Sequence, residues 1–183
     1  MADSLAGAGA LSDVERAQRF GVFVAEYRDK ALRVAWRLLG GNDAAAEDVV
    51  QEALIRGFRA LTSFRGEAAL STWFYRILVR EVRRHQRWAA VRARWNSPAT
   101  DEEADPAPSG TPDILLRERI AKAMEKLPRG QREVFVLVHL ETFTVVQAAE
   151  ALGKSPGTVK SHLHRALVAL RNELADLREG ASS

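Results

Sequence analysis

Two sets of capping signals near the C-terminus constrain the fold of this chain more than any other feature. Thr144 begins a Thr-x-x-Gln capping box, in which the threonine caps a helix and the glutamine reaches back to it. Gly153 stands where a left-handed residue ends that helix, and Ser155-Pro156 reads as an N-cap followed by proline at the first helical position. Two short helices joined by a turn that contains glycine predict a helix-turn-helix over residues 144–171.

The second helix of this motif separates an apolar stripe from a small, polar and basic face. Such a face suits the major groove of duplex DNA, where it meets phosphates and base edges. The alternative is an ordinary solvated helix face, but with both caps and the turn in register DNA contact is the favoured interpretation. The candidate duplex-binding residues are Ser155, Thr158, Lys160, Ser161, His162, His164 and Arg165.

The charge of the chain is unevenly distributed, although the net charge is only +3 over 183 residues. Residues 54–95 hold ten arginines against two glutamates, whereas residues 101–118 hold six acids against one arginine. This asymmetry indicates a nucleic-acid partner.

Composition also excludes several classes of protein. The chain has no cysteine, so it has neither disulfides nor thiolate metal sites, which suits a reducing compartment. No apolar run approaches the roughly 20 residues that a membrane span needs. The first residues lack the basic start and apolar core of a signal peptide. We therefore expect a cytoplasmic protein without a membrane span.

Helical periodicity runs through the rest of the chain, and no segment alternates with a period of two. An apolar stripe predicts a first helix over residues 20–38. Either Asn42 or Asp43 caps a second helix, and a third runs from about Ser71 to near Trp95. The fold class is therefore expected to be all-α.

A change of composition divides the chain into two parts. Residues 96–112 hold four of the six prolines and four acids with almost nothing apolar, which predicts a flexible acidic linker. We expect two small helical domains, residues 19–95 and residues 113–179, with a disordered tail over residues 1–18.

Aromatic and arginine residues lie next to each other on the predicted third helix. This combination suits a single strand of nucleic acid, because bases stack on rings while guanidinium groups follow the backbone. The alternative is that Trp73, Phe74 and Ile77 are core residues, which we expect for Phe74 and Ile77, while both interpretations stay open for Trp73. Arginines recur at helical spacing at Arg76, Arg80, Arg83 (or Arg84) and Arg87.

The second predicted helix carries an acidic face opposite its apolar stripe, formed by Glu47, Asp48, Gln51, Glu52 and Ile55. An acidic face repels DNA, so it is either solvated surface or a docking site for a basic protein partner. Considered alone, the pattern favours solvated surface.

An enzyme is the least favoured class. The four histidines are His85, His139, His162 and His164. A helix points His162 and His164 in different directions, and no acid near these two completes a metal set. The chain has no glycine-rich phosphate loop. We expect no catalytic residues, no metal and no cofactor.

Taken in order, these segments resemble the extracytoplasmic-function (ECF) group of bacterial RNA polymerase sigma factors, which keep only sigma regions 2 and 4. The resemblance covers about residues 20–177. It is carried by DAAAEDVVQEALIRGF, FRGEAALSTWFYRI, the arginine-rich helix, the linker, LPRGQREVFVLV and GKSPGTVKSHLHRALVALR.

The resemblance implies a role for each surface. The acidic face would dock on the clamp helices of the polymerase beta-prime subunit, which overturns the solvated-surface interpretation. The loop over residues 64–70 would capture a flipped base of the melted non-template strand of the minus-ten element, and Lys160, Ser161, His162 and Arg165 match the minus-thirty-five contacts. The minus-ten residues implied in this way are Phe64, Arg65, Gly66, Glu67, Trp73, Tyr75, Arg76, Arg80, Arg83, Arg84 and Arg87.

The resemblance implies three partners. They are core RNA polymerase, bound through its beta-prime clamp helices and its beta flap; promoter DNA, both duplex and melted; and an anti-sigma factor. The chain would be a monomer when it is free of these partners.

The family often has asparagine where this chain has Arg80, and arginine where it has His162. The main alternative is an autonomous helix-turn-helix regulator. That alternative predicts self-association and leaves the acidic helix without a role.

Overall fold

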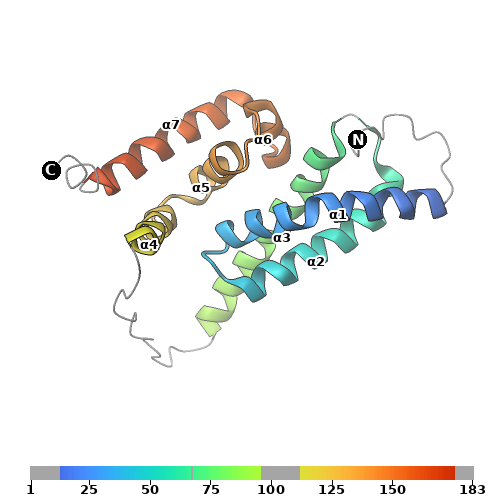
Figure 1. Cartoon of the computed structure of the whole chain (residues 1–183), viewed down its shortest axis with the longest axis horizontal. Coiled ribbons are helices and arrows are strands. Elements are labelled where there is room, and N and C mark those ends of the chain that lie inside the picture. Colours follow the sequence, from blue (N-terminus) through green and yellow to red (C-terminus); the bar gives the residue numbers. More distant parts are fainter. Residues whose placement is uncertain (1–12, 67, 96–111, 176–183) are drawn as a thin grey trace.

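The computed structural model describes residues 13–66, 68–95 and 112–175, and within these ranges every regular element is a helix (Figure 1). The all-α fold class is therefore confirmed. The elements are α1 (Asp13–Leu38), α2 (Asp43–Ala60), a 3-10 turn η1 (Leu61–Ser63), α3 (Leu70–Trp95), α4 (Pro112–Glu125), α5 (Arg129–Phe135), a π-helical turn η2 (Val136–Leu140), α6 (Val145–Leu152) and α7 (Pro156–Glu173).

Helices α1, α2 and α3 pack together through the apolar stripes that the sequence predicts (Figure 1). Phe23 of α1 meets Phe74 of α3 edge to face, with ring centroids 5.2 Å apart. Asn42, not Asp43, caps α2, since its side chain accepts a 2.8 Å hydrogen bond from the Ala45 amide. The buried residues of α2 include Val49, Val50 and Ala53, whereas Phe58 near its end is 49% exposed.

Two boundaries differ from the expected ones. Helix α1 begins at Asp13, inside the tail predicted over residues 1–18, and Glu15 in its first turn is favourable at the positive end of the helix dipole. Residues 1–12 and most of the predicted linker, residues 96–111, lie outside the described residues. Pro112, predicted to end the linker, is the first residue of α4, because proline suits a first helical position.

The helix-turn-helix is confirmed in each of its signals. The Thr144 hydroxyl accepts from the Gln147 amide at 3.2 Å, and the Gln147 side chain accepts from the Thr144 amide at 2.9 Å. Gly153 ends α6 with φ 64°, and Ser155 caps α7. Both helices therefore start and stop where local hydrogen bonding dictates.

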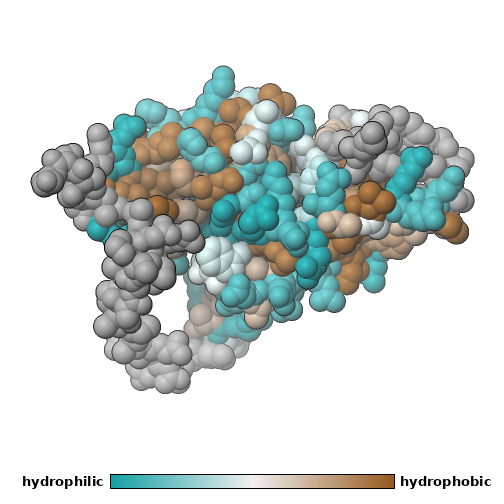
Figure 2. Space-filling view, in the orientation of Figure 1, coloured by the Kyte–Doolittle hydropathy of each residue, from teal (hydrophilic) through white to brown (hydrophobic). Residues whose placement is uncertain are grey.

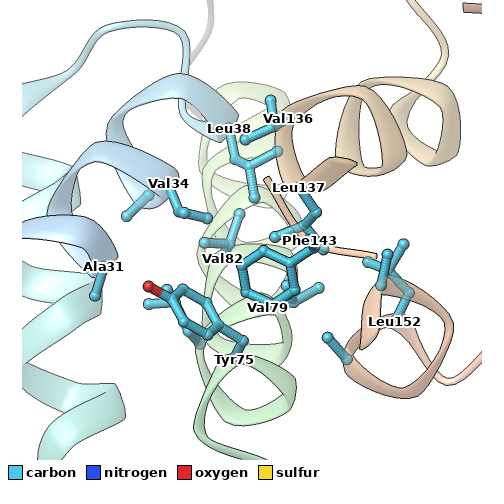
Figure 3. Close-up of a cluster of buried hydrophobic side chains, with 14 of the residues drawn as sticks. Ala31, Val34, Leu38, Tyr75, Val79, Val82, Val136, Leu137, Phe143 and Leu152 are labelled. Carbon is cyan, nitrogen blue, oxygen red and sulfur yellow. The ribbon is translucent and has the colours of Figure 1, made fainter. Parts of the chain in front are cut away.

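The N-terminal helices and α4–α7 share one continuous hydrophobic core. Figure 3 shows Tyr75, Val79 and Val82 of α3 facing Leu137, Phe143 and Leu152. The Tyr75 and Phe143 rings meet edge to face, with centroids 4.9 Å apart. We call this packing of the two domains on each other the closed arrangement.

Candidate nucleic-acid interface

The outer face of α7 presents the predicted duplex-binding residues to solvent. Lys160, Ser161, His164 and Arg165 are exposed, while the apolar stripe of the same helix is buried against α5 and α6. Helical spacing places these side chains together because the buried residues hold the opposite side of the helix.

Three other predicted duplex-binding residues are already engaged within the domain. The Ser155 hydroxyl accepts from the Thr158 amide at 3.2 Å and lies 2.9 Å from the Thr158 hydroxyl, so both residues form the cap of α7. His162 is half-buried, and its ring lies so close to Gly130 of α5 that a Cβ there would come within 2.8 Å of it. These three residues therefore shape the start of α7 more than they extend its exposed face.

The loop before α3 and the first turns of α3 form a pocket of about 390 Å³. Phe64 and Trp73 contact each other in this pocket, with ring centroids 5.2 Å apart, so Trp73 is half-buried and lines the pocket wall. Gly66 has φ 72°, a left-handed conformation that favours glycine. Glu67 lies outside the described residues.

One wall of this pocket comes from the other domain. Glu150 of α6 lines the pocket, and the Arg76 guanidinium donates a 3.0 Å hydrogen bond to the Glu150 carbonyl. In the closed arrangement the helix-turn-helix therefore lies beside the surface predicted to hold the melted strand.

The arginine stripe of α3 is divided between two neighbours. Arg83 donates two hydrogen bonds of 2.7 Å to the carboxylate of Glu133 on α5, whose side chain is 3% exposed. The hydrogen bond to Glu133 raises the pKa of Arg83. Arg84 instead pairs with Glu81 of its own helix at 2.9 Å and lies 3.6 Å from Glu52 of α2, and Arg87 is exposed.

Tyr75 is not available for DNA contact in this arrangement, contrary to the expectation from the resemblance. Its side chain is fully buried, because α3 packs with one side against α1 and α2 and with the other against α6. Burial, followed by the nearby Glu141 carboxylate, raises the pKa of Tyr75 well above its usual range.

Two more polar contacts hold the domains together. Arg37 at the end of α1 pairs with Glu141, which is 4% exposed, and the ammonium of Lys30 lies 5.0 Å from the centroid of the Phe143 ring. Glu133, Glu141 and Glu150 were not singled out by the sequence. Nothing in their spacing shows that their partners lie on distant helices.

The predicted docking face on α2 is accessible. Glu47, Asp48, Gln51 and Ile55 are exposed, whereas Glu52 is half-buried and pairs with Arg56 at 2.7 Å. Figure 2 shows hydrophilic residues over much of the N-terminal helices in this view, while hydrophobic residues gather over the C-terminal helices.

The described residues hold no cluster of three or more histidine and acidic side chains that could bind a metal ion. No helix within the described ranges has the length and apolar character needed to cross a membrane.

The fold and these surfaces define a class: a helical DNA-binding protein with a helix-turn-helix for duplex DNA and an aromatic–arginine surface on a second domain. Residues 23–91 match the family Sigma-70 region 2, and residues 117–170 match Sigma-70, region 4.

Two curated proteins illustrate the relationship. The ECF RNA polymerase sigma-E factor of Escherichia coli (strain K12) is 30% identical over 184 residues, which covers 90% of this chain and 93% of that protein. The ECF RNA polymerase sigma factor SigW of Bacillus subtilis (strain 168) is 30% identical over 178 residues, covering 86% and 90%. The chain belongs to the ECF RNA polymerase sigma factors, and it directs RNA polymerase to promoters and initiates transcription.

Solved structures agree with this assignment. The sigma factor RpoE in complex with the anti-sigma factor NepR from Bartonella quintana has a TM-score of 0.70 at 25% identity, covering 85% of this chain and 96% of that chain. CnrH in complex with the cytosolic domain of CnrY has a TM-score of 0.69 at 25% identity, covering 96% and 99%. Both comparisons extend over the two domains of this chain.

Proposed function

We propose that the two domains divide promoter recognition between them. Residues 113–179 would read the minus-thirty-five duplex through Lys160, Ser161, His164 and Arg165. Residues 19–95 would dock on core polymerase and open the minus-ten element. The observation that carries this division is that the exposed basic face of α7 and the Phe64–Trp73 pocket lie on different domains.

The docking surface in this proposal is the exposed face of α2. Glu47, Asp48, Gln51 and Ile55 would bind the clamp helices of the beta-prime subunit, because they form an exposed acidic face that ends in one apolar side chain, Ile55. Glu52 would contribute indirectly, since its carboxylate already pairs with Arg56. The C-terminal domain would bind the beta flap.

The minus-ten surface is the Phe64–Trp73 pocket together with the arginines of α3. A flipped base of the non-template strand would enter this pocket and stack on an aromatic ring, a contact worth about 1–3 kcal/mol. Arg65 and Arg87 are exposed and suited to the strand backbone. Tyr75 would support the pocket from the core.

Use of both surfaces at once requires the closed arrangement to open. Arg76 and Arg83 bind the C-terminal domain in the closed arrangement, so they would become available to DNA only after the domains separate. We propose that an anti-sigma factor binds and retains this closed arrangement, since the similar solved structures are of sigma factors in such complexes. The chain would act in the cytoplasm, as a monomer when free, and without enzymatic activity of its own.

Run-off transcription with bacterial core polymerase and a library of promoter fragments tests the division. The wild-type chain should give transcripts that start at defined sites. Lys160→Ala with Arg165→Ala should lose the preference for the minus-thirty-five sequence, whereas Phe64→Ala should lose opening at minus-ten. As a matched control, Arg28→Ala on the exposed side of α1 should change neither.

If either the α7 double variant or Phe64→Ala lost both the minus-thirty-five preference and the opening at minus-ten, the proposed division of promoter recognition between the domains would be wrong. Binding of DNA by the wild-type chain without any initiation would favour the autonomous regulator instead.

A further inference from the structure

A second pocket lies at the boundary between the two domains, separate from the Phe64–Trp73 pocket. It has a volume of about 210 Å³. The residues that line it are Leu38 from α1, Val82 and Gln86 from α3, and Arg129, Arg132 and Glu133 from α5. We call it the boundary pocket. Because both domains supply its walls, it is complete only in the closed arrangement.

The two domains contribute different chemistry to the boundary pocket. Leu38 and Val82 are buried apolar side chains at the domain boundary (Figure 3). Gln86 is half-buried, and its amide donates a 2.9 Å hydrogen bond to the Leu38 carbonyl, which holds α3 to the end of α1. The C-terminal domain adds Arg129, which is exposed, and Arg132, which is half-buried. The pocket therefore combines apolar surface from one domain with positive charge from the other.

Glu133 is the one carboxylate among the residues that line the boundary pocket, and it is already neutralised. Arg83 donates two hydrogen bonds of 2.7 Å to it, whereas the Nε of Arg129 lies 3.8 Å away, beyond hydrogen-bond distance. Three guanidinium groups (Arg83, Arg129 and Arg132) against one carboxylate leave a local charge of +2.

Arg132 is fixed in position but keeps an unused donor. Its guanidinium donates to the Glu125 carbonyl and, at 3.3 Å, to the Leu127 carbonyl, which holds it at the turn between α4 and α5. Its Nε is buried and has no hydrogen-bond partner among the described residues. Leaving a buried donor unpaired is unfavourable, so an acceptor that enters the pocket would be stabilised by this group.

These features define the chemistry of a ligand for the boundary pocket. Guanidinium groups present fixed donors that suit the oxygens of phosphates and carboxylates. A phosphate group is favoured over a carboxylate, because it carries a charge of about −1.5 to −2 at pH 7, which matches the local charge. The volume of the pocket is below the roughly 300 Å³ at which pockets for larger ligands begin, so the anion must be small.

We propose that the boundary pocket binds a small anion that carries a phosphate group, with Arg129 and Arg132 as its contacts. Binding stabilises the closed arrangement, because the ligand binds only molecules whose domains are packed together. The ligand thereby keeps Arg76 and Arg83 away from DNA, so a small molecule regulates the free chain. Binding itself depends on the pocket alone, whereas the effect on DNA rests on the proposed opening of the domains.

Isothermal titration calorimetry of the full chain tests binding, with inorganic phosphate and glycerol 3-phosphate as probes. The wild type should bind, and Arg129→Gln and Arg132→Gln should each weaken binding by at least about tenfold, because each removes charge-assisted hydrogen bonds. Tighter binding of glycerol 3-phosphate would identify an organic phosphate that also contacts Leu38 and Val82. Tighter binding of inorganic phosphate would identify the free ion.

A matched control separates the pocket from a general loss of charge. Arg28 on α1 resembles Arg129, since each side chain is more than half exposed (54% and 59%) and lies 3.8 Å from one carboxylate. Arg28→Gln should therefore leave the affinity for phosphate unchanged. Arg129→Gln should also keep the unfolding midpoint of the wild type without phosphate, whereas Arg132→Gln removes contacts that hold the turn before α5.

A second measurement tests the effect on the closed arrangement. At a phosphate concentration of about ten times the dissociation constant, the ratio of open to closed molecules should fall by about 11-fold. Binding of a single-stranded minus-ten oligonucleotide by the free chain should weaken by up to this factor, relative to sodium chloride at the same ionic strength. Arg129→Gln should lose this response to phosphate.

The outcomes distinguish this proposal from the one on which its effect on DNA rests. If the wild type binds neither probe, or if Arg129→Gln and Arg132→Gln bind as tightly as the wild type, the boundary pocket is not an anion site. If phosphate binds through these arginines but weakens oligonucleotide binding no more than sodium chloride does, the ligand does not hold the domains closed. A wild type that binds phosphate but no oligonucleotide would refute the proposed minus-ten role and leave the anion site in place.

Discussion

Tyr75 lies at the boundary between the two domains, with its ring against Phe143 and its hydroxyl pointing away from that ring towards α1 (Figure 3). The hydroxyl is buried and has no hydrogen-bond partner among the described residues. A buried polar group that is left unpaired costs about 1–3 kcal/mol. The ring of Tyr75 therefore stabilises the fold by packing, whereas its unpaired hydroxyl destabilises the fold.

The first prediction concerns that penalty. Tyr75→Phe keeps the ring and removes the unpaired hydroxyl, so the free energy of unfolding should rise by about 1 kcal/mol at neutral pH. Urea denaturation followed by circular dichroism would measure it. A fall of more than about 1 kcal/mol would show that the hydroxyl makes a stabilising contact.

The second prediction concerns alkaline pH. Burial raises the pKa of Tyr75 in the folded protein, so near and above its ordinary value of about 10 the unfolded chain loses this proton while the folded chain keeps it. The unfolded state then binds fewer protons, and this residue lowers the stability of the wild type by about 1.4 kcal/mol per pH unit above that value. Tyr75→Phe should lack this component, so the stability difference between the two proteins should widen between pH 9.5 and pH 11. A constant difference over that range would contradict the buried, neutral tyrosine.

The helix-turn-helix shows at the scale of an element how backbone conformation limits sequence. Gly153 ends α6 in the left-handed region with φ 64°, and a Cβ added there would meet nothing within 4 Å. Any cost of a side chain at this position is therefore a backbone cost. Gly21 in α1 would also meet nothing within 4 Å, but it has an ordinary helical backbone.

The third prediction compares these two glycines. Gly153→Ala should lower the free energy of unfolding by about 1–2 kcal/mol, because alanine is strained at positive φ. Gly21→Ala should raise it by about 0.5–1 kcal/mol, since alanine favours a helix interior. Thermal denaturation of both variants would measure the pair. Equal effects of the same sign would refute the assignment of a left-handed C-cap.

Some helices of this chain are easier to predict from sequence than others. The boundaries of α6 and α7 follow from local capping chemistry, which a sequence displays directly: Thr144, Gly153 and Ser155 act as expected. Helix α3 is harder to predict because it packs against α1 and α2 on one side and against α6 on the other. The periodicity of its apolar residues does not show that a second side of the helix is also buried. The resemblance to sigma factors places Tyr75 among the DNA-binding residues, whereas its ring is buried in the core.

The candidate site was predictable to a similar extent. The exposed face of α7 and the acidic face of α2 can each be predicted from the position of the apolar stripe on a single helix. Most of the residues expected on these two faces are exposed. The Arg83–Glu133 and Arg76–Glu150 contacts join residues that are 50 and 74 positions apart in the chain. Helical periodicity carries no information about such pairs, so the closed arrangement could not be anticipated.

At the scale of the whole molecule, the closed arrangement opposes the use of Arg76 and Arg83 for DNA. The Glu133 carboxylate is 3% exposed and neutralises Arg83 across the domain boundary, while Arg129 on its own helix lies 3.8 Å away. Hydrogen bonds to a charged group contribute about 1.5–3 kcal/mol each, so this pair is a main polar contact between the domains.

The fourth prediction is that Glu133→Gln shifts the chain towards an open form. The amide keeps the shape but loses the charge that binds Arg83, which we expect to weaken the closed arrangement by about 1–2 kcal/mol, or roughly 5- to 30-fold in the ratio of open to closed molecules. The chain has no cysteine of its own, so dyes can be placed on Glu26→Cys in α1 and Asn172→Cys in α7. Energy transfer between the dyes should fall in Glu133→Gln. It should stay unchanged in Glu173→Gln, whose carboxylate pairs with Lys126 inside the C-terminal domain.

The same change should act on DNA binding only while the chain is free. If only open molecules bind the minus-ten strand, the apparent dissociation constant is the intrinsic one divided by the open fraction. Glu133→Gln should then tighten binding of a single-stranded minus-ten oligonucleotide by about the factor by which it raises the open fraction. Core polymerase should abolish the difference between variant and wild type, because the proposed use of both surfaces on a promoter requires the domains to be apart. A difference of the same size in the holoenzyme would mean that Glu133 acts on DNA directly and that the closed arrangement does not restrict access to α3.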